Sequence, residues 1–573
     1  MDTSRLVRTS GTLAATAALL ISAVVSGTAS PAGAVAPARA RETGSGAEGP
    51  NTSPALLDLL LTEERGTAAA PAATEPLPTV DDVANPLSPP PSATLKPLPA
   101  AVPAALRPYY RQKLRWHACS GKAARGFECT TLRAPLDYAA PRDGDVKLAV
   151  SRKKAGGSGR HLGSLLVNPG GPGGSAIGFL QEYAADNYPA RVRDRYDMVA
   201  MDPRGVAAST PIKCLTDKEM DAYARVDQTP DDATEERRLI ASYKKFAEGC
   251  ATRSGKLLRH VSTVEAARDM DLLRAALGDD KLHYVGASYG TFLGATYAGL
   301  YPARVGRLVL DGALDPSLDS RRINRDQTAG FQTAFSSFAR DCDGRDDCPL
   351  PGGPAVASAR LKRFFDQLDR HPLATGKPRP LTESLATTGV ISTMYDEAAW
   401  PLLRRALASA MEGDGGSLLK LSDAYYERDG RGHYTNLMAA NSAVNCLDLP
   451  PAFTGAAGVR RALPDFVKAS PALGTSFAWS ALSCAYWPVP AVGRPHRIPA
   501  RGAAPILVVG TTRDPATPYP WARGLASQLS SGRLLTYDGD GHTAYTRGSS
   551  CIDTAINSYL LTDHAPPASQ RCS

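Results

Sequence analysis

The feature that most constrains the fold is a short apolar run that ends in a serine between glycines. Residues Leu282 to Val285 alternate in character and predict a short buried strand. The next residues, Gly286-Ala-Ser-Tyr-Gly290, match G-x-S-x-G, and the alanine- and leucine-rich stretch from Thr291 to Leu300 predicts a helix. A strand, a tight turn with serine at its apex and a helix are the setting of a nucleophile elbow, in which small residues let strand and helix approach. We therefore expect Ser288 to be a nucleophile at the C-terminal edge of a sheet.

Strands and helices alternate on both sides of this turn. Strands are predicted at 146–151, 165–167, 197–201, 306–310, 505–510 and 533–537, and an amphipathic helix at 262–277 with Thr263 as its N-cap. This alternation predicts an α/β fold with a mainly parallel central sheet. Between residues 316 and 495 it gives way to helical segments separated by Gly- and Pro-rich loops. We therefore expect a core of residues 106–315 and 496–573 that carries an inserted helical lid, residues 316–495.

Two further segments precede this core. Residues 1–34 have the build of a signal peptide: Arg5 and Arg8, an apolar stretch from Gly11 to Val25, and small residues before a cleavage point near Ala34. That apolar stretch is too short to span a membrane comfortably, so no stable membrane insertion is expected after cleavage. Residues 35–105 are rich in Ala, Pro, Thr and Ser and predict a disordered linker, a pro-segment or a wall-spanning tether. The expected location is extracellular, either free or associated with the cell wall.

Charge and cysteine content exclude several classes of function. The 65 basic and 57 acidic residues are scattered, without the dense Lys/Arg block of a nucleic-acid-binding protein. The ten cysteines include no C-x-x-C pair, and the chain has no H-E-x-x-H motif, so we expect disulfides in an oxidising compartment and no metal. Locality predicts five pairs of neighbours in the sequence: Cys119–Cys129, Cys214–Cys250, Cys342–Cys348, Cys446–Cys484 and Cys551–Cys572. The acidic stretch 341–347 lacks the spacing of a calcium loop and is interpreted as a solvated disulfide loop.

A serine hydroxyl needs a base to take its proton, and in this fold class the order along the chain is serine, acid, histidine. His542 stands in a Gly-rich loop directly after the last predicted strand, which can carry its imidazole over the strand ends, so we expect it to be the base. His283 is expected to pack within its strand, and His564 to be a surface residue. Two aspartates compete to orient the imidazole, and Asp514 is preferred over Asp311 because its loop follows the strand nearest His542 in the chain.

Acyl transfer also needs donors for the oxyanion. The backbone N–H of Tyr289 is one candidate, and that of Gly171, in the Gly-rich loop after the early strand, is the other. The same loop, from Gly171 to Ala176, also matches the dinucleotide fingerprint G-x-G-x-x-A. Pro169 and Pro172 fit such a phosphate turn badly, so a redox enzyme is disfavoured and no cofactor is expected.

Several motifs together resemble a known family. They are Asn168-Pro-Gly-Gly-Pro-Gly-Gly-Ser175, Asp202-Pro-Arg-Gly-Val206, Gly286-Ala-Ser-Tyr-Gly-Thr291, Leu310-Asp-Gly312, Ala443-Val-Asn-Cys-Leu-Asp448, Asp514-Pro-Ala-Thr-Pro518 and Gly539-Asp-Gly-His-Thr543. The set, which covers the chain from about Leu114 onward, resembles the secreted α/β-hydrolase peptidases of actinobacteria called tripeptidyl aminopeptidases, relatives of the prolyl aminopeptidases. The resemblance implies the triad Ser288, Asp514 and His542, a helical lid that blocks longer N-terminal extensions, and release of short peptides, in this family tripeptides, from free N-termini. One departure is Ala207-Ala208, where the family pattern has glycine after Val206.

An aminopeptidase must also recognise a protonated amine, for which lid carboxylates are suited. Asp448, beside Cys446, is the candidate for this role, and the alternative is that it caps or pairs with a lid helix. The expected partners are therefore peptides with free N-termini. Two other functions stay open: an esterase or lipase with the same triad, because a triad does not fix the bond cleaved, and a non-catalytic binding protein that kept the fold.

Overall fold

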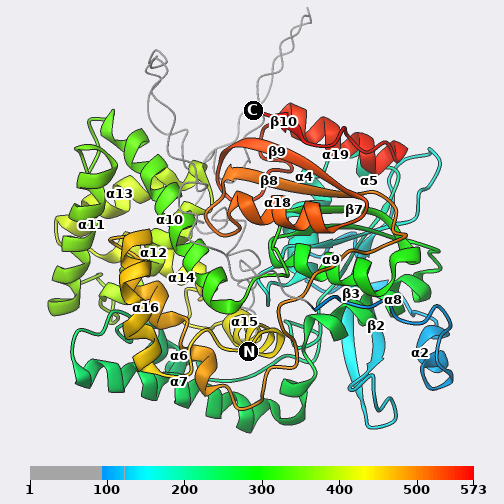
Figure 1. Cartoon of the computed structure of the whole chain (residues 1–573), viewed down its shortest axis with the longest axis horizontal. Coiled ribbons are helices and arrows are strands. Elements are labelled where there is room, and N and C mark those ends of the chain that lie inside the picture. The colour runs from blue at the N-terminus through cyan, green and yellow to red at the C-terminus, as the bar shows by residue number, and fades with distance from the viewer. Residues whose placement is uncertain (1–92, 122) are drawn as a thin grey trace, which may run out of the picture.

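The computed structural model describes residues 93–121 and 123–573 of the 573-residue chain (Figure 1). The predicted signal peptide, residues 1–34, and most of the predicted linker lie outside the described residues. Within the described part, no helix combines the length and the apolar character needed to cross a membrane.

One ten-stranded sheet forms the core, in the order β1-β2-β3-β5-β4-β6-β7-β8-β9-β10. β1 to β3 and the β3–β5 contact are antiparallel, whereas the remaining neighbours, from β5 across to β10, pair in parallel. Every strand expected from the sequence is present, and the mainly parallel α/β-hydrolase sheet is confirmed. The strands are β1 (His117–Ala118), β2 (Glu128–Pro135), β3 (Asp145–Lys153), β4 (Ser164–Asn168), β5 (Asp197–Met201), β6 (Leu282–Ala287), β7 (Val305–Asp311), β8 (Ile506–Arg513), β9 (Gly532–Asp540) and β10 (Gln570–Cys572).

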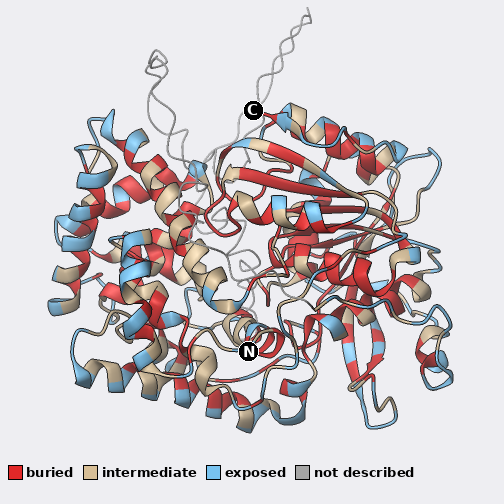
Figure 2. Cartoon of the chain, in the orientation of Figure 1, coloured by how far each residue is buried: buried red, intermediate tan, exposed pale blue. Residues whose placement is uncertain are grey.

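Helices cover both faces of this sheet because its central strands are apolar on both sides. On one face α8 (Thr263–Leu277), α9 (Tyr289–Leu300) and α18 (Tyr519–Gln528) bury Leu272, Leu293 and Leu525 against the strands. On the other face lie α3 (Ala176–Phe179), the π-helix η3 (Leu180–Ala184), α4 (Ala185–Asn187), α5 (Ala190–Arg193) and α19 (Ser550–Thr562). The buried residues of Figure 2 run through the sheet between these two layers. Helix α8 ends at Gly278 (φ +84°), as a left-handed C-cap requires, but its N-cap is Ser262 and not the predicted Thr263.

The lid occupies the left half of Figure 1 and is inserted between β7 and β8. Its own apolar core joins helices far apart in the sequence, including Phe335, Phe365, Leu385, Leu407 and Leu418. The lid helices are α10 (Ser320–Asp343), α11 (Gly353–Arg370), α12 (Glu383–Met394), η6 (Glu397–Ala399), α13 (Trp400–Met411), α14 (Gly416–Tyr425), α15 (Leu437–Asp448), α16 (Ala456–Ala469), α17 (Gly474–Ser480) and η7 (Ser483–Tyr486).

A second helical excursion extends the lid, and the sequence analysis assigned it to the core. It consists of α6 (Asp217–Ala224), α7 (Ala233–Ser254) and η4 (Gly255–Arg259), between β5 and α8. Leu239 and Tyr243 of α7 are buried with Phe466 and Trp479 of the lid. The charged face of α7 was visible in the sequence, but the partner of its apolar face was not.

The ordered chain begins earlier than the predicted start near residue 106. Leu95 N–H donates to the carbonyl of Arg497 at 2.9 Å, and Leu98 N–H to that of Leu300, also at 2.9 Å. Leu95 and Leu98 pack on the core, ahead of η2 (Ala104–Leu106) and α2 (Arg107–Tyr110). Residues 93–105, expected to be linker, are therefore part of the folded enzyme.

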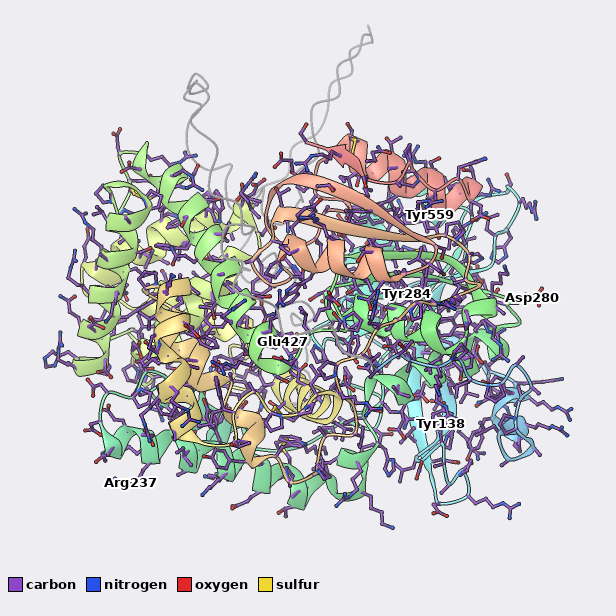
Figure 3. The ribbon with its side chains drawn as sticks, viewed as in Figure 1. Tyr138, Arg237, Asp280, Tyr284, Glu427 and Tyr559 are labelled. Atoms are coloured by element: carbon purple, nitrogen blue, oxygen red, sulfur yellow. A yellow bond between two sulfur atoms is a disulfide. The ribbon has the colours of Figure 1, made fainter. Side chains whose placement is uncertain are left out.

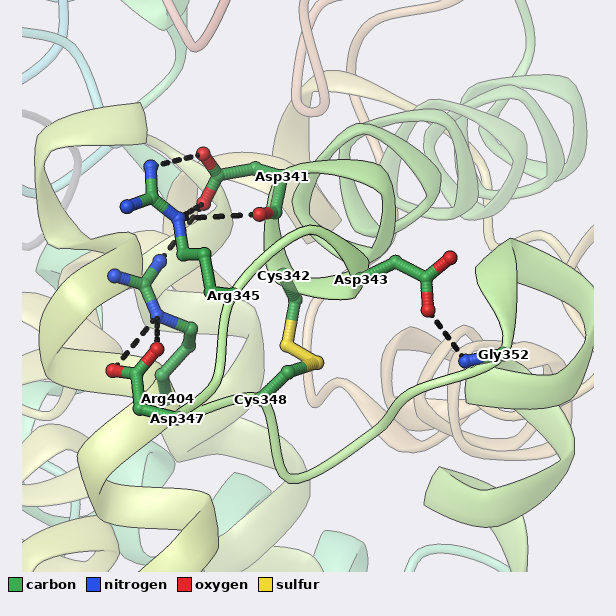
Figure 4. Close-up of a disulfide and its surroundings, with 8 residues drawn as sticks. All are labelled: Asp341, Cys342, Asp343, Arg345, Asp347, Cys348, Gly352 and Arg404. Carbon is green, nitrogen blue, oxygen red and sulfur yellow. Dashed lines mark hydrogen bonds and ion pairs between the residues drawn. A yellow bond between two sulfur atoms is a disulfide. The ribbon is translucent and has the colours of Figure 1, made fainter. Parts of the chain in front are cut away.

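All five disulfides join the neighbours that locality predicted, and no cysteine is free among the described residues. Figure 4 shows the smallest loop, closed by Cys342–Cys348. Asp341 pairs there with Arg345 at 2.7 Å and Arg404 at 2.8 Å, and Asp343 accepts the N–H of Gly352 at 2.6 Å. The carboxylates of this acidic loop are thus engaged by arginines and by backbone, as expected for a structural loop.

Candidate active site

The turn between β6 and α9 holds Ser288 in a strained backbone conformation. Its φ of 56° and ψ of −127° lie in a region that only glycine enters without strain. The flanking glycines show why the turn tolerates no larger residues. A Cβ atom at Gly286 would lie 2.5 Å from the carbonyl oxygen of Gly290, and one at Gly290 would lie 2.9 Å from that of Asn168. The sequence therefore specifies a tight elbow with Ser288 at its apex.

The loops after β8 and β9 bring Asp514 and His542 together. His542 Nδ1 lies 2.9 Å from each carboxylate oxygen of Asp514, and both side chains are fully buried. Asp514 also accepts the N–H groups of Ala516, Thr517 and Thr543, which fix its orientation. Because Nδ1 faces a carboxylate, the ring proton belongs there, and Nε2 is the basic nitrogen. Among the described residues, His542 Nε2 has no hydrogen-bond partner.

The competing acid, Asp311, has a different role. Its carboxylate accepts the N–H groups of Ala544 (3.0 Å to Oδ2) and Tyr545 (2.9 Å), just beyond His542. Burial raises the pKa of Asp311 to about 6, although these hydrogen bonds and His542 act in the opposite direction. Asp311 thus braces the loop that carries His542, whereas Asp514 contacts the imidazole itself.

Ser288 and His542 flank the same two residues at the end of β7. The N–H of Ser288 donates to the carbonyl of Asp311 at 2.9 Å. At the next residue, Gly312 (φ +68°), a Cβ atom would lie 3.1 Å from Cε1 of His542. Only a glycine lets the ring come this close to the strand end that supports the serine.

The Gly-rich loop after β4 lies directly over the elbow. A Cβ atom at Gly170 (φ +97°) would lie 2.9 Å from both Ser288 Cβ and Tyr289 N. Asn168 Oδ1 accepts the N–H of Gly170 at 2.9 Å, so Gly171 is the next residue whose N–H can point toward the serine. Tyr289 begins α9, and the first N–H groups of a helix have no intrahelical acceptor. The two residues expected to supply oxyanion donors thus border Ser288 from two loops.

The same loop is covered by the lid. A Cβ atom at Gly173 would lie 2.6 Å from the carbonyl oxygen of Leu437, at the start of α15, and Asn441 Nδ2 donates to the carbonyl of Pro172 at 3.0 Å. Helix α15 therefore occupies the side of the loop on which the dinucleotide fingerprint would have to receive phosphates.

Two contacts of the triad were missed by the sequence analysis. Thr517 Oγ1 donates to Asp514 Oδ2 at 2.9 Å and lies 3.3 Å from His542 Nδ1. The ring of Tyr395, at the end of α12, meets the imidazole edge to face at 5.5 Å, and its carbonyl accepts the N–H of His542 at 2.8 Å. The spacing Asp-x-x-Thr was a readable signal for Thr517, because such a hydroxyl reaches back to the carboxylate three residues earlier. Nothing in the sequence pointed to Tyr395.

Asp448 is buried at the end of α15 against the first turn of α8. Its Oδ1 accepts the N–H of Thr263 at 2.8 Å, and Thr263 Oγ1 lies 2.5 Å from both Asp448 Oδ2 and the hydroxyl of Tyr289. Burial raises the pKa of Asp448 to about 7, against the hydrogen bonds from Thr263. These are the contacts of the helix-capping alternative, and they link the lid to the residue after Ser288. A role for Asp448 in amine binding stays a prediction.

The remaining histidines have structural surroundings. His283 Nδ1 accepts the N–H of Arg307 at 3.1 Å, and burial lowers the pKa of His283 to about 4, in keeping with a packed strand residue. His564 is exposed, as expected.

Three groups of carboxylates and histidine in the described chain lie close enough to share a cation, and none includes a triad residue. Such groups are common without an ion. They are Asp137/His260/Glu265, Asp227/Glu235/Asp369 and Asp231/Asp232/Glu235.

Comparison with known proteins places this geometry among hydrolases. A family model described as TAP-like protein matches residues 470–572, which contain Asp514 and His542. Serine protease Hip1 of Mycobacterium tuberculosis is 39% identical over 489 residues, which cover 81% of this chain and 92% of that protein. Carboxylesterase B of the same species is 39% identical over 504 residues, covering 85% and 95%. A tripeptidyl aminopeptidase of Streptomyces lividans is 32% identical over 491 residues, covering 81% and 87%.

Proposed function

We propose that this chain, which belongs to the α/β-hydrolase serine peptidase family of the tripeptidyl aminopeptidases, releases tripeptides from the free N-termini of peptides outside the cell. The observation that carries the proposal is the buried Asp514–His542 pair, whose open Nε2 belongs to the same strand ends as the strained Ser288.

The proposed mechanism has two halves. His542 Nε2 takes the proton of Ser288 as the hydroxyl attacks the scissile carbonyl, and the N–H groups of Gly171 and Tyr289 hold the oxyanion. The imidazolium, stabilised by Asp514, then gives its proton to the leaving amine, and the acyl-enzyme remains on Ser288. Water repeats the sequence on the acyl-enzyme, which releases the short peptide and restores the serine. Each half moves one proton through His542 and returns it.

The lid supports an exopeptidase rather than an enzyme that cuts within long chains. Ser288 is only 8% exposed, and the lid residue Tyr395 contacts the imidazole directly. Helix α15 covers the oxyanion loop from the other side. A folded or long polypeptide cannot lie across a serine enclosed in this way, whereas a chain end can enter.

Export from the cytoplasm is supported by the five disulfides, since such bonds persist in oxidising compartments. Treatment of the natural secreted fraction with a thiol-reactive mass tag, with and without prior reduction, tests this part. Ten added tags only after reduction are expected, and labelling without reduction would contradict it.

The activity is tested with a pair of chromogenic tripeptides that differ only at the N-terminus. Ala-Ala-Ala-p-nitroanilide should be cleaved at least about 100-fold more efficiently than its N-acetyl derivative, because the acetyl group removes the charge and adds bulk under the lid. Equal kcat/KM for the two would contradict the aminopeptidase proposal.

An esterase is the second candidate, because one relative of 39% identity carries the name carboxylesterase B. It predicts that p-nitrophenyl esters of simple acids are turned over with a higher kcat/KM than any tripeptide anilide. The same panel of substrates therefore decides between the two activities.

A further inference from the structure

Two carboxylates outside the triad face each other between the lid and the core. Glu182 lies on η3, which continues α3, and Glu427 follows α14. Burial raises the pKa of each carboxyl to about 7, and the negative charge of Glu182 contributes to the shift at Glu427. Figure 3 shows Glu427 between the lid helices and the sheet.

The carboxylate of Glu427 lacks a partner for one oxygen. The residue is 7% exposed, Oε2 accepts a hydrogen bond from Thr435 Oγ1, and Oε1 has no partner among the described residues. Its backbone is also unusual for a non-glycine residue, with φ of 51°, and is held by the N–H of Thr435, which donates to the Glu427 carbonyl at 3.3 Å. A buried carboxylate oxygen without a donor is costly, and a residue held in a strained conformation to present it indicates a ligand.

No cation balances these two charges within residues 93–121 and 123–573. Neither glutamate forms an ion pair there, and the half-buried carboxylate of Glu182 accepts no hydrogen bond from that part of the chain. The cation beside Tyr183, Arg547, is already engaged: it lies 2.9 Å from Asp396 and donates to the carbonyls of Tyr395 and His542. Two adjacent carboxylates without a counter-ion are suited to a cationic ligand.

The pair borders the catalytic loops on three sides. Helix α3 starts at Ser175, directly after the oxyanion loop, and leads to Glu182. Tyr183 OH lies 2.8 Å from Thr546 Oγ1, in the loop that carries His542. The partner of Glu427, Thr435, stands just before α15, whose first turn packs against Gly173. The two carboxylates are thus held by elements that themselves contact the machinery around Ser288.

The helix that carries Glu182 also gives a length. Seven helical residues separate Ser175 from Glu182, which at 1.5 Å per residue is about 10 Å. Three extended peptide residues span about 10 Å as well. A substrate whose scissile carbonyl lies at Ser288 and whose chain follows this helix would therefore bring its third residue from the cut to Glu182.

We infer that Glu182 and Glu427 form the subsite that binds the protonated α-amino group of the substrate, one tripeptide length from Ser288. This inference rests on the proposed function and deepens it. An ammonium group offers three N–H donors, enough for Glu427 Oε1, for Glu182 and for one further acceptor. In the free enzyme the two carboxylates repel each other, and the bound amine removes that repulsion. A blocked N-terminus would leave both charges unpaired under the lid.

The test compares Glu427→Gln, Glu182→Gln and the matched control Glu383→Gln on the free and N-acetylated Ala-Ala-Ala-p-nitroanilides. Glu383 is an equally buried lid glutamate (7% exposed) that hydrogen-bonds Thr229 instead. Each variant of the pair is expected to lose about 10- to 100-fold in kcat/KM on the free tripeptide, mostly through KM, because a charge-assisted hydrogen bond is lost. The preference for the free over the acetylated substrate should fall by the same factor, and Glu383→Gln should keep the wild-type preference.

The outcomes separate this inference from the proposal on which it rests. A wild-type enzyme without preference for the free N-terminus would refute the aminopeptidase itself. A wild-type preference that survives unchanged in both Glu182→Gln and Glu427→Gln would overturn only the subsite. If Glu427→Gln fails to fold, Glu182→Gln still decides, because the Glu182 carboxylate is half-buried and makes no hydrogen bond in the described chain. Dipeptide and tetrapeptide anilides cleaved as well as the tripeptide would overturn the assigned length.

Discussion

His542 Nδ1 lies 2.9 Å from both carboxylate oxygens of Asp514, and its Nε2 has no hydrogen-bond partner in the described chain. This pairing fixes which nitrogen keeps its proton and which is free to act as a base. Because the pair is fully buried, water does not weaken the interaction. The strained turn at Ser288 and the loop over it then need only one more event, entry of a substrate, for the chemistry to start.

The pairing predicts unequal effects for two buried aspartates. Asp514→Asn should lower kcat by about 10³- to 10⁴-fold, because an amide facing Nδ1 favours the wrong imidazole tautomer. Asp311→Asn is the matched control, since Asp311 is equally buried and hydrogen-bonds Ala544 and Tyr545 but not the imidazole. Its kcat should fall by less than about 10-fold. Steady-state kinetics that rank the two variants in the opposite order would show that Asp311 is the orienting acid.

Thr517 predicts a smaller effect at the same site. Its hydroxyl lies 2.9 Å from Asp514 Oδ2, so Thr517→Val removes one donor from a buried carboxylate while keeping the shape. We expect kcat to fall about 10-fold with KM nearly unchanged, as for the loss of one hydrogen bond that orients the base. Thr512→Val, which removes a hydroxyl bonded to the exposed Asp538, serves as the control and should stay within about 2-fold of wild type. A Thr517→Val enzyme as active as that control would argue against a positioning role.

The approach of the oxyanion loop to the elbow predicts that Gly170 accepts no side chain. In Gly170→Ala the new Cβ atom would lie 2.5 Å from the carbonyl oxygen of Ala287 and 2.9 Å from Tyr289 N, so the loop must move away from Ser288. Activity should fall at least about 100-fold, since oxyanion donors act only when positioned closely. Gly278→Ala is the control for positive φ alone, because Gly278 has φ +84° with no atom within 4 Å of the added Cβ atom. It should cost about 1 kcal/mol of stability and leave kcat unchanged.

The uncompensated charge of Glu427 predicts a pH-dependent stability difference. Its pKa, about 7 in the folded enzyme because of burial, lies above the value of about 4.3 expected in the unfolded chain. The stabilising contribution of the protonated carboxyl is therefore complete below pH ~4 and is lost as the pH rises through about 7. Glu427→Gln stays neutral, so its free energy of unfolding should exceed that of wild type by about 2–3 kcal/mol at pH 8 and equal it at pH 4. Denaturant titrations at the two pH values measure this, and a destabilised variant at pH 8 would mean that an unseen cation already pairs with Glu427.

Much of the fold was readable because its signals are local. The strand before Ser288, the glycines around it and the loop of His542 each announce themselves within about ten residues. The disulfides followed locality for the same reason: each joins segments that the fold keeps close. The choice between Asp514 and Asp311 depended on chain order, and the contacts of the two carboxylates follow the preferred order.

The remaining features depend on tertiary contacts that no local pattern encodes. Tyr395 reaches His542 only because the lid folds back over strands that are distant in the sequence. Glu182 and Glu427 were ordinary charged residues in the sequence, and only their shared burial without a counter-ion distinguishes them. Asp448 shows the converse, because a carboxylate singled out by its motif is engaged by Thr263 in the structure. Residues 93–105 were expected to be linker since their composition matches the preceding segment, yet their backbone pairs with Arg497 and Leu300.

The most direct test of the account is covalent labelling of Ser288 with a fluorophosphonate probe, read by intact-protein mass spectrometry. Wild-type enzyme should gain one adduct, located to the peptide that contains Ser288, with loss of tripeptide anilide hydrolysis at the same rate. The Ser288→Ala variant should gain none and should retain its fold by circular dichroism. Equal labelling of the two proteins, or an adduct on another residue that abolishes activity, would contradict the assignment of Ser288 as the nucleophile.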